Sequence, residues 1–236
     1  MTIAYGLWYE SGAAYDAALR GALQARPKAR VCDVGAGANP SFPIEYAQES
    51  GARITLLDIS RVELDKAPAG FEAIVADVAD PNLALTDSFD VVCSRMLAEH
   101  VRNATAFHAN VRRLLRPGGV AVHYFPTLWT LPFIVNVVTP EPLARVILQV
   151  VRPRKDPWRQ GKFPAYYRMC RGPSQRQLRR LDALGFDVLE YHAFFGHGYY
   201  ERFPPLQALV ERWSRMLVRR PVPWLTSYAV VVLRRR

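Results

Sequence analysis

The sequence predicts an α/β fold in which helices cover both faces of a mainly parallel sheet. Three observations support this: short apolar runs alternate with helical patterns, a glycine turn follows the first run, and an acid ends the second. The alternation requires crossover connections, which produce parallel strands, and ligands of such sheets bind outside the carboxyl ends of the strands. We expect strands at about 30–34, 53–57, 72–76, 89–93 and 119–125, and helices at about 43–50, 60–66 and 103–116.

The stretch Arg30–Pro40 is typical of a strand, a tight turn and the start of a helix that Pro40 opens. Gly35 and Gly37 lack the Cβ atoms that would keep a ligand away from the turn. A helix N-terminus adds unpaired N–H groups and a positive dipole end. We therefore expect a ligand to lie across this turn.

Two acids indicate which ligand suits the turn. Asp58 follows the glycines by about twenty residues, where a carboxylate can accept hydrogen bonds from both hydroxyls of a ribose. A nicotinamide dinucleotide would fit this equally well, but the turn lacks the third glycine of G-x-G-x-x-G. Asp33 also precedes Gly35 by two residues, and its carboxylate would repel a pyrophosphate yet accept hydrogen bonds from an ammonium group. The charges favour a cationic nucleoside.

Five pieces in order, over roughly residues 28–125, resemble the class I S-adenosylmethionine-dependent methyltransferases, and the type 11 methyltransferases among them. After the glycine turn come Ala76-Asp77-Val78, Phe89–Ser94, Leu97–Val101 and Leu114–Gly119. The resemblance implies a Rossmann-like, mostly parallel sheet of seven strands, the last one antiparallel, and S-adenosylmethionine as cofactor.

The resemblance also implies roles for individual residues. Gly35 and Gly37 would back the methionine part of the cofactor, Asp58 would hold the ribose, and Asp77 would contact the adenine amino group. Ser94 and Arg95 would border the sulfonium. Each acid has an alternative role as a helix cap or a surface charge. The full expected cofactor site is Asp33, Gly35, Ala36, Gly37, Asn39, Asp58, Ile59, Asp77, Val78, Ser94 and Arg95.

We expect one domain over residues 1–236: an N-terminal cap helix (1–27), the cofactor-binding core (28–125), a substrate lid inserted after the fifth strand (126–172), and the end of the sheet (173–236). The last part reads as a helix from Ser174 to Gly185, a strand at about 186–193, a helix with a basic face at about 204–219, and a final strand at about 226–233. The lid is rich in proline and apolar residues. Pro140, Glu141, Pro142 and Arg145 interrupt it, so it is not one spanning helix. Its segment 128–155 could contact a membrane surface peripherally or pack on the protein.

Composition limits the choices further. A chain of 236 residues suits one domain with an insertion, and its three scattered cysteines suit a reducing compartment. The first ten residues lack a secretory pattern, so we expect a cytoplasmic protein, with the inner face of a membrane as a further location. Residues 1–125 hold 12 Lys and Arg against 14 Asp and Glu, whereas residues 126–236 hold 19 against 7. This excess can indicate nucleic acid, an anionic membrane, an acidic substrate or a solvated arginine-rich face.

A hydroxyl acceptor needs a base, because the developing oxonium must lose its proton. His100, His197 and Glu99 are the candidates at the carboxyl edge, and we expect His100 and His197 to be catalytic; a loop-shaping hydrogen bond is the alternative for each. His123 and His192 read as packed core residues. Glu99-His100 is similar to the E-x-x-E-H segment of metal-dependent O-methyltransferases, but Met96 occupies the position of the first glutamate, and we expect no metal.

Aromatic and arginine side chains cluster at the end of the lid. Aromatic faces can stack on sugars or flat ligands, and arginines can bind phosphate or carboxylate. This segment and the loop Gly196–Tyr200 resemble, more loosely, methyltransferases that act on glycans or glycolipid intermediates. The expected acceptor residues are Tyr166, Tyr167, Arg168, Arg171 and Tyr199.

The sequence therefore predicts an O-methyltransferase acting on a small or carrier-linked acceptor, such as a sugar or lipid-linked metabolite. An RNA methyltransferase is the first alternative; against it, the segment after the fourth strand reads C-S-R-M-L-A-E-H and not N-P-P-Y, so we do not expect nucleic acid as a partner. A noncatalytic regulator or membrane-surface partner that keeps the cofactor fold is the second.

Overall fold

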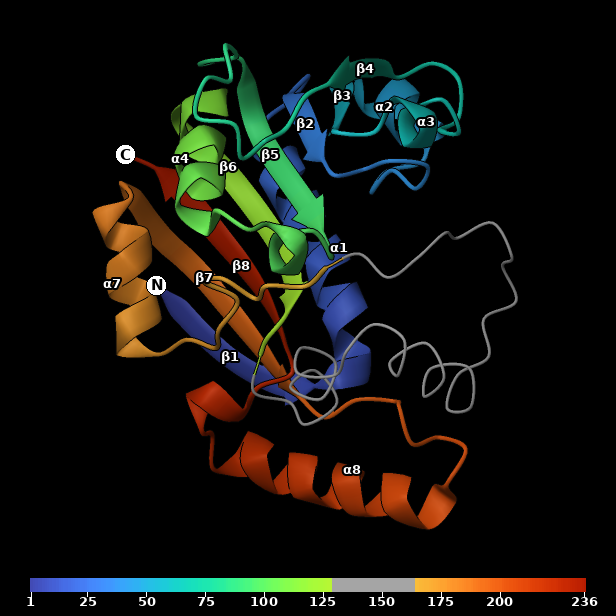
Figure 1. Cartoon of the computed structure of the whole chain (residues 1–236), viewed down its shortest axis with the longest axis vertical. Helices are drawn as coiled ribbons and strands as arrows, with labels where there is room; N and C mark the ends of the chain where they lie inside the picture. The colour runs from blue at the N-terminus through green and yellow to red at the C-terminus, as the bar shows by residue number, and fades with distance from the viewer. Residues whose placement is uncertain (129–163) are drawn as a thin grey trace.

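A computed structural model of the chain describes residues 1–128 and 164–236. Eight strands form one sheet in the order β1-β7-β8-β6-β5-β2-β3-β4 (Figure 1). Only β8 runs antiparallel to its neighbours β6 and β7, as the methyltransferase resemblance implied. The strands are β1 (Thr2–Leu7), β2 (Arg30–Val34), β3 (Arg53–Asp58), β4 (Glu72–Val75), β5 (Phe89–Arg95), β6 (Leu115–Pro126), β7 (Phe186–Phe195) and β8 (Tyr228–Arg235).

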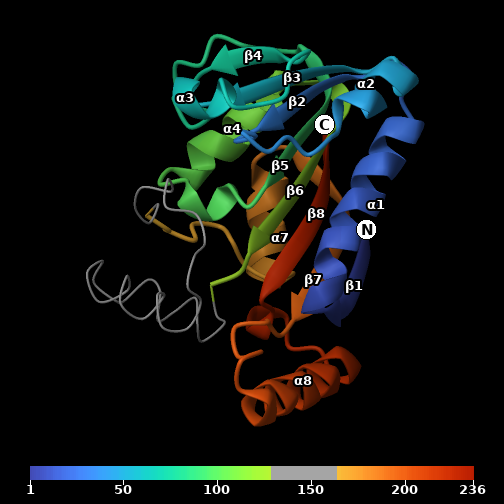
Figure 2. The same cartoon turned by 90° about the vertical axis from the view of Figure 1, so that its right-hand side faces the viewer.

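Helices cover both faces of the sheet, as Figures 1 and 2 show from two directions. One face packs against α1 (Ser11–Gln24), α2 (Ile44–Ser50) and α3 (Arg61–Leu64), through buried residues such as Leu19 and Leu64. The other packs against α4 (Ala104–Leu114) and α7 (Gln175–Ala183), through residues such as Phe107 and Leu181. Strand residues alternate between these two cores, which is why the central strands are apolar at nearly every position.

Local signals set the helix ends as the sequence predicts. The Ser174 side chain accepts a hydrogen bond from Gln177 N and caps α7, and Gly185 follows that helix with a φ of +84°. The Asn103 side chain caps α4 in the same way. The helix near the C-terminus, α8 (Pro204–Arg219), begins with two prolines, whose missing N–H groups cost nothing in a first turn.

The N-terminal segment departs from the expectation of a cap helix over residues 1–27 and a sheet of seven strands. Thr2–Leu7 is a strand that pairs in parallel with β7, and it makes the sheet eight-stranded. The ring of Tyr5 stacks on Phe195 with centroids 5.8 Å apart. Without β1, the edge of β7 would present unpaired backbone groups to solvent, and pairing satisfies them.

The loop after β2 continues past Pro40, up to the helix expected at about 43–50. Pro40 does not open the following helix: α2 begins at Ile44, with Pro43 as its N-cap residue. The residues after Gly37 therefore form an irregular loop, because Asp33 binds Ser41 and holds the chain there. Residues 129–163, which include most of the expected lid and of the segment 128–155, lie outside the described residues.

Two glycines offer a matched test of packing. An added Cβ at Gly172 would lie 1.7 Å from Pro223 O and 2.5 Å from Thr226 Oγ1, whereas at Gly21, inside α1, it would meet nothing within 4 Å. We expect Gly172→Ala to lower the free energy of unfolding by at least ~2 kcal/mol. Gly21→Ala should raise it by roughly 0.5–1 kcal/mol, because alanine loses less backbone entropy on folding. Chemical denaturation measures both, and equal effects would contradict the packing described here.

Candidate active site

The carboxyl ends of the central strands lie at one edge of the sheet. Val34 of β2 pairs with Leu57 of β3 and with Ser94 of β5, so the next residue of each strand lies at the same level. Those three residues are Gly35, Asp58 and Arg95. The parallel register therefore brings together three groups from distant parts of the sequence, all of them expected to bind the cofactor.

A larger residue at the first position of the glycine turn would strain the backbone and force the Leu97 side chain to shift. Gly35 has a φ of +70°, and an added Cβ would lie 2.7 Å from Leu97 Cδ1. Gly37 has a φ of +47°, and its added Cβ would lie 3.4 Å from Asp58 Oδ2. The close approach between Gly37 and Asp58 keeps the carboxylate beside the turn, so a ligand on the turn would lie within reach of it.

Asp33 holds the loop after the glycine turn through hydrogen bonds with Ser41. Its side chain is 1% exposed, and its oxygens accept hydrogen bonds from Ser41 N at 2.6 Å and from Ser41 Oγ at 3.1 Å. Burial raises the pKa of Asp33 to about 6, which the bonds from Ser41 partly oppose. These bonds give Asp33 a structural role in holding the loop; its expected contact with the ligand ammonium group stays a prediction.

Two further residues of the expected cofactor site lie in this loop. Ala36 is buried, and the carbonyl of Asn39 accepts a hydrogen bond from Arg95.

The two acids after β3 and β4 each organise a short turn. Asp58 Oδ1 accepts from Ser60 N at 2.9 Å, and Asp77 Oδ1 accepts from Ala79 N at 2.8 Å. The second oxygen of each carboxylate accepts no hydrogen bond from the residues that the structure describes. Ile59 is 69% exposed beside Asp58, whereas Val78 is buried in the core.

Ser94 is fully buried, and its hydroxyl lies 2.8 Å from His123 Nδ1. Burial lowers the pKa of His123 to about 3, so this imidazole stays neutral and belongs to the packed core, as the sequence suggested. Arg95 is the exposed member of the expected Ser94 and Arg95 pair.

Glu99 and His100 lie just beyond β5. Glu99 is 3% exposed, and burial raises the pKa of its carboxyl to about 8. Its carbonyl accepts hydrogen bonds from Tyr166 N and Tyr167 N, which ties this turn to the end of the expected lid. His100 Nδ1 lies 2.9 Å from Pro164 O, and His100 Nε2 lies 3.7 Å from Glu99 Oε1. A carbonyl only accepts, so Nδ1 carries the proton and Nε2 carries the lone pair.

His197 is the second histidine that the sequence analysis expected to be catalytic, and it lies in the loop after β7. The loop after β7 reaches the same edge, because β7 and β6 both run antiparallel to β8. His197 is 5% exposed, burial lowers its pKa, and its Nδ1 accepts from Tyr199 N at 3.3 Å. The neutral ring then carries its proton on Nε2, so it is arranged as a hydrogen-bond donor and not as a base.

The expected acceptor residues fall into two groups. Tyr166 and Arg168 are exposed, whereas Tyr167 is buried in the core with a φ of +49°. Arg171 is half-buried and donates hydrogen bonds to the carbonyls of Tyr167 and Cys170. Tyr199 lies edge-on to His197, with ring centroids 5.5 Å apart.

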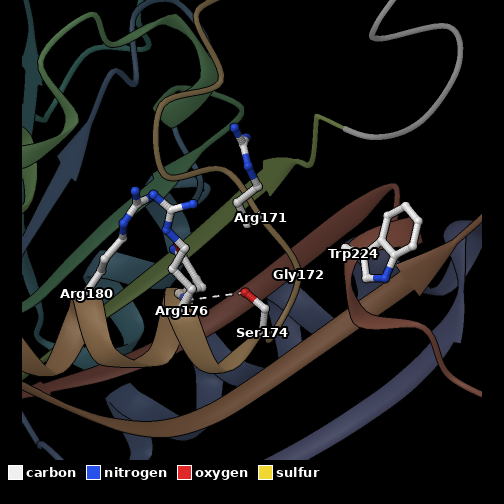
Figure 3. A pocket seen from close by; sticks show the side chains of 7 residues that line it. Arg171, Gly172, Ser174, Arg176, Arg180 and Trp224 are labelled. Carbon is white, nitrogen blue, oxygen red and sulfur yellow. Dashed lines mark hydrogen bonds between the residues drawn. The ribbon is translucent and has the colours of Figure 1, made fainter.

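Arg171 also lines a cavity of about 340 Å³ together with Arg176 and Arg180 of α7 (Figure 3). Trp224 forms the opposite wall, and the backbone of Gly172 lies close to Pro223, the residue before Trp224. The neighbouring arginines add to desolvation in lowering the pKa of Arg171. Arg176, Arg180 and Trp224 were not among the expected acceptor residues, although the i, i+4 spacing of the two arginines on a predicted helix was a visible signal.

Comparison with known proteins identifies the family. Residues 9–191 match the sequence profile described as "Methyltransferase domain", which is most of the chain. The chain belongs to this methyltransferase family. It is a class I S-adenosylmethionine-dependent methyltransferase, and the glycine turn with its neighbouring acids lies where this fold binds its ligand.

The chain is also similar to ubiquinone biosynthesis O-methyltransferases from strains of Xanthomonas oryzae pv. oryzae. They are 30% identical over 149 residues, covering 59% of this chain and 61% of theirs, so the chain matches about three fifths of the length of these curated relatives.

Solved structures share the fold at lower identity. An S-adenosylmethionine-dependent methyltransferase from Mesorhizobium loti has a TM-score of 0.55 and 21% identity, covering 94% of this chain and 100% of its own. Geranyl diphosphate C-methyltransferase from Streptomyces coelicolor A3(2) has a TM-score of 0.59 at 15% identity, with coverages of 95% and 79%. The [4+2]-cyclase SpnF has a TM-score of 0.56 at 15% identity, with coverages of 95% and 80%. At these identities the likeness shows the fold alone.

Replacing Asp58 tests the expected ribose contact. We expect Asp58→Ala to weaken S-adenosylmethionine binding by ~1–3 kcal/mol, because buried ribose hydroxyls would lose their acceptor. Calorimetric titration with S-adenosylmethionine and S-adenosylhomocysteine measures the change, with NAD as the negative control ligand. Asp65→Ala, an exposed acid at the end of α3, is the matched variant and should bind as the parent does. Unchanged affinity in Asp58→Ala would remove Asp58 from the site.

The buried carboxyl of Glu99 should make stability depend on pH. Its folded pKa of about 8 exceeds the ordinary value of 4.5, so between these values the folded protein retains a proton that the unfolded chain has lost. Stability must therefore fall as pH rises through this window. Glu99→Gln should remove that part of the loss and become more stable than the parent at pH 8, by on the order of a few kcal/mol.

Urea denaturation near pH 5 and near pH 8 measures the effect of Glu99→Gln. Glu49→Gln, an exposed glutamate of α2, provides the control and should leave the slope unchanged. Parallel profiles for the parent and Glu99→Gln would show that Glu99 titrates normally.

Proposed function

We propose that this methyltransferase transfers its methyl group to an oxygen atom of a small or carrier-linked acceptor, with His100 as the general base. The observation that carries the proposal is the tautomer of His100, which the carbonyl of Pro164 fixes. The similarity to ubiquinone biosynthesis O-methyltransferases supports an oxygen acceptor.

The residues that would hold the cofactor are those of the turn and its neighbours: Gly35 and Gly37 against the methionine part, Asp58 on the ribose and Asp77 toward the adenine. When bound, S-adenosylmethionine supplies an electrophilic methyl group on a sulfonium sulfur. Residues of this chain then have two tasks, which are to align the acceptor oxygen with that methyl group and to receive the proton it loses.

His100 suits the second task. Its Nδ1–H is committed to Pro164 O, so the lone pair on Nε2 can take the acceptor proton while the new C–O bond forms and the C–S bond breaks. Glu99 Oε1 lies 3.7 Å from Nε2, which is too long for a hydrogen bond. Burial raises the pKa of Glu99 to about 8, so near neutral pH its carboxyl is protonated and lies beside the His100 ring without a charge. His197 is better suited to orienting the acceptor, since its Nδ1 is occupied by Tyr199 N.

The arginine cavity indicates a second property of the acceptor. Arg176 and Arg180 make no ion pair within the described parts of the chain, and no acidic residue lines the cavity among them. Three guanidinium groups in one concave site favour an anionic group, and Trp224 offers a face for stacking. We infer that the acceptor carries a carboxylate or phosphate group, as a carrier-linked metabolite would. An RNA acceptor is the runner-up, which the same arginines favour.

Turnover with His100→Ala tests the assignment. We expect a fall in kcat of ~10²–10⁴ on a phenolic or sugar hydroxyl acceptor, because proton removal is lost, while the affinity for S-adenosylhomocysteine stays unchanged. His192→Ala is the matched control, since His192 pairs with Glu190 on β7, which β8 and β6 separate from β5 in the sheet. Formation of S-adenosylhomocysteine gives the rate, and mass spectrometry with NMR identifies the methylated atom. A methylated nitrogen, or full activity of His100→Ala, would contradict the proposal.

A further inference from the structure

The helix α8 carries an apolar stripe on its outer side. Leu206, Leu209, Trp213 and Met216 follow one another at intervals of three, four and three residues, so they share one face of the helix. Their exposed fractions are 42%, 63%, 55% and 43%. We call these four residues the outer stripe. Single exposed apolar side chains are normal on the surface of a monomer. Four large ones in one row instead form a continuous apolar patch, which is typical of an interaction site.

The inner side of α8 is unusually polar for a helix that covers a sheet. Gln207 and Ser214 are among its buried residues, and Gln207 Nε2 donates a hydrogen bond to His197 O at 3.1 Å. An added Cβ at Gly196 would lie 2.6 Å from Ser214 Oγ, which shows how closely the helix packs on that loop. Leu217 is buried on the same side, so the inner side of α8 combines polar and apolar groups while the outer stripe faces away.

Arginines accompany the outer stripe. Arg212 and Arg219 are exposed next to it, and Arg220 follows at its end. None of these three makes an ion pair with a residue that the structure describes, whereas Arg215 pairs with Glu211 at 3.5 Å. Large apolar side chains with adjoining arginines are the composition of helices that lie in the plane of an anionic membrane surface.

The location of α8 suits such a contact. Both views of the molecule place α8 beyond the end of the sheet at which β5 and β6 end (Figures 1 and 2). That is the cofactor edge, and α8 packs against β1 and β7 there. A flat surface that touched the outer stripe would therefore lie on the side toward which the carboxyl ends of β1, β6 and β7 point.

We propose that α8 docks this protein on an anionic lipid bilayer, with the outer stripe in the boundary between head groups and acyl chains and the arginines on the lipid phosphates. A second copy of the chain fits the surface less well. Pairing two α8 helices would bring Arg212 and Arg219 of both copies together, with only Glu201 and Glu211 nearby in sequence to offset them. This docking goes beyond the proposed function and does not depend on which atom is methylated. No described helix is long and apolar enough to cross a bilayer, so the contact would be peripheral.

Vesicle flotation of the full chain, without cofactor or acceptor, tests the proposal. We expect binding to vesicles of phosphatidylcholine and phosphatidylglycerol in equal amounts, and weak binding to phosphatidylcholine alone. Leu209→Gln with Trp213→Gln should lower the partition coefficient at least ~10-fold, because the apolar contact is lost. Arg212→Gln with Arg219→Gln should lower it by roughly 30-fold on the anionic vesicles, and added salt should also lower the binding of the parent.

Val62→Gln is the matched control, since Val62 is 65% exposed on α3 and lies outside the stripe. Its binding to vesicles should equal that of the parent. Light scattering without vesicles tests the other occupant: a dimer that Leu209→Gln with Trp213→Gln dissociates would overturn the proposal in favour of a second copy. Equal binding to both vesicle types, or none to either, would also overturn it. Methyl transfer to a soluble acceptor, measured on the same variants, separates a failure of docking from a failure of catalysis.

Discussion

The parallel register of β5, β2 and β3 is the constraint on which the site depends. Backbone hydrogen bonds hold Val34 level with Leu57 and Ser94, and the next residue of each strand then emerges at one edge. A slip of one residue would turn Asp58 to the opposite face of the sheet and move it away from Gly37. Because all three strands are buried between two cores, such a slip would exchange the side chains that each core receives and disrupt the packing of both. The packing of the sheet thus fixes the geometry of the cofactor site.

The strands that this register aligns are the elements that the sequence predicts best. The strands that carry the glycine turn and Asp58, and the antiparallel last strand, were found where expected, since apolar runs and strand-ending acids are local signals. The early strand β1 was missed, because Thr2–Leu7 is partly exposed at an edge and lacks a strong apolar pattern. The prediction that Pro40 opens a helix was wrong, because a proline can open a helix or lie in a loop. Here the hydrogen bond between Asp33 and Ser41 selects the loop. Burial and long-range hydrogen bonds were not visible in the sequence.

The same limit applies to the catalytic candidates. Residue type makes His100 and His197 equivalent, and their spacing from the strands does not separate them. Their partners do: Pro164 O requires a proton on Nδ1 of His100, whereas Tyr199 N requires a lone pair on Nδ1 of His197. Pro164 follows His100 by 64 residues, so only the fold brings its carbonyl to the ring. The distinction between a base and a donor therefore arises from two backbone groups and not from the histidines themselves.

The polarity of α8 connects the site to the surface of the molecule. The inner face of α8 buries Gln207 and Ser214 beside Leu217, so it gains less from apolar burial than a face of leucines, and the hydrogen bond from Gln207 to the carbonyl of His197 adds to the attachment. The leucines and the tryptophan on the outer side would stabilise the isolated domain if they were turned inward, yet they face away. An arrangement with this local disadvantage indicates selection for a contact outside the domain. Gln207 donates a hydrogen bond to the carbonyl of His197. A displacement of α8 by a contact on the outer stripe would therefore be transmitted to a loop at the cofactor edge. Attachment and acceptor binding would then share one structural element.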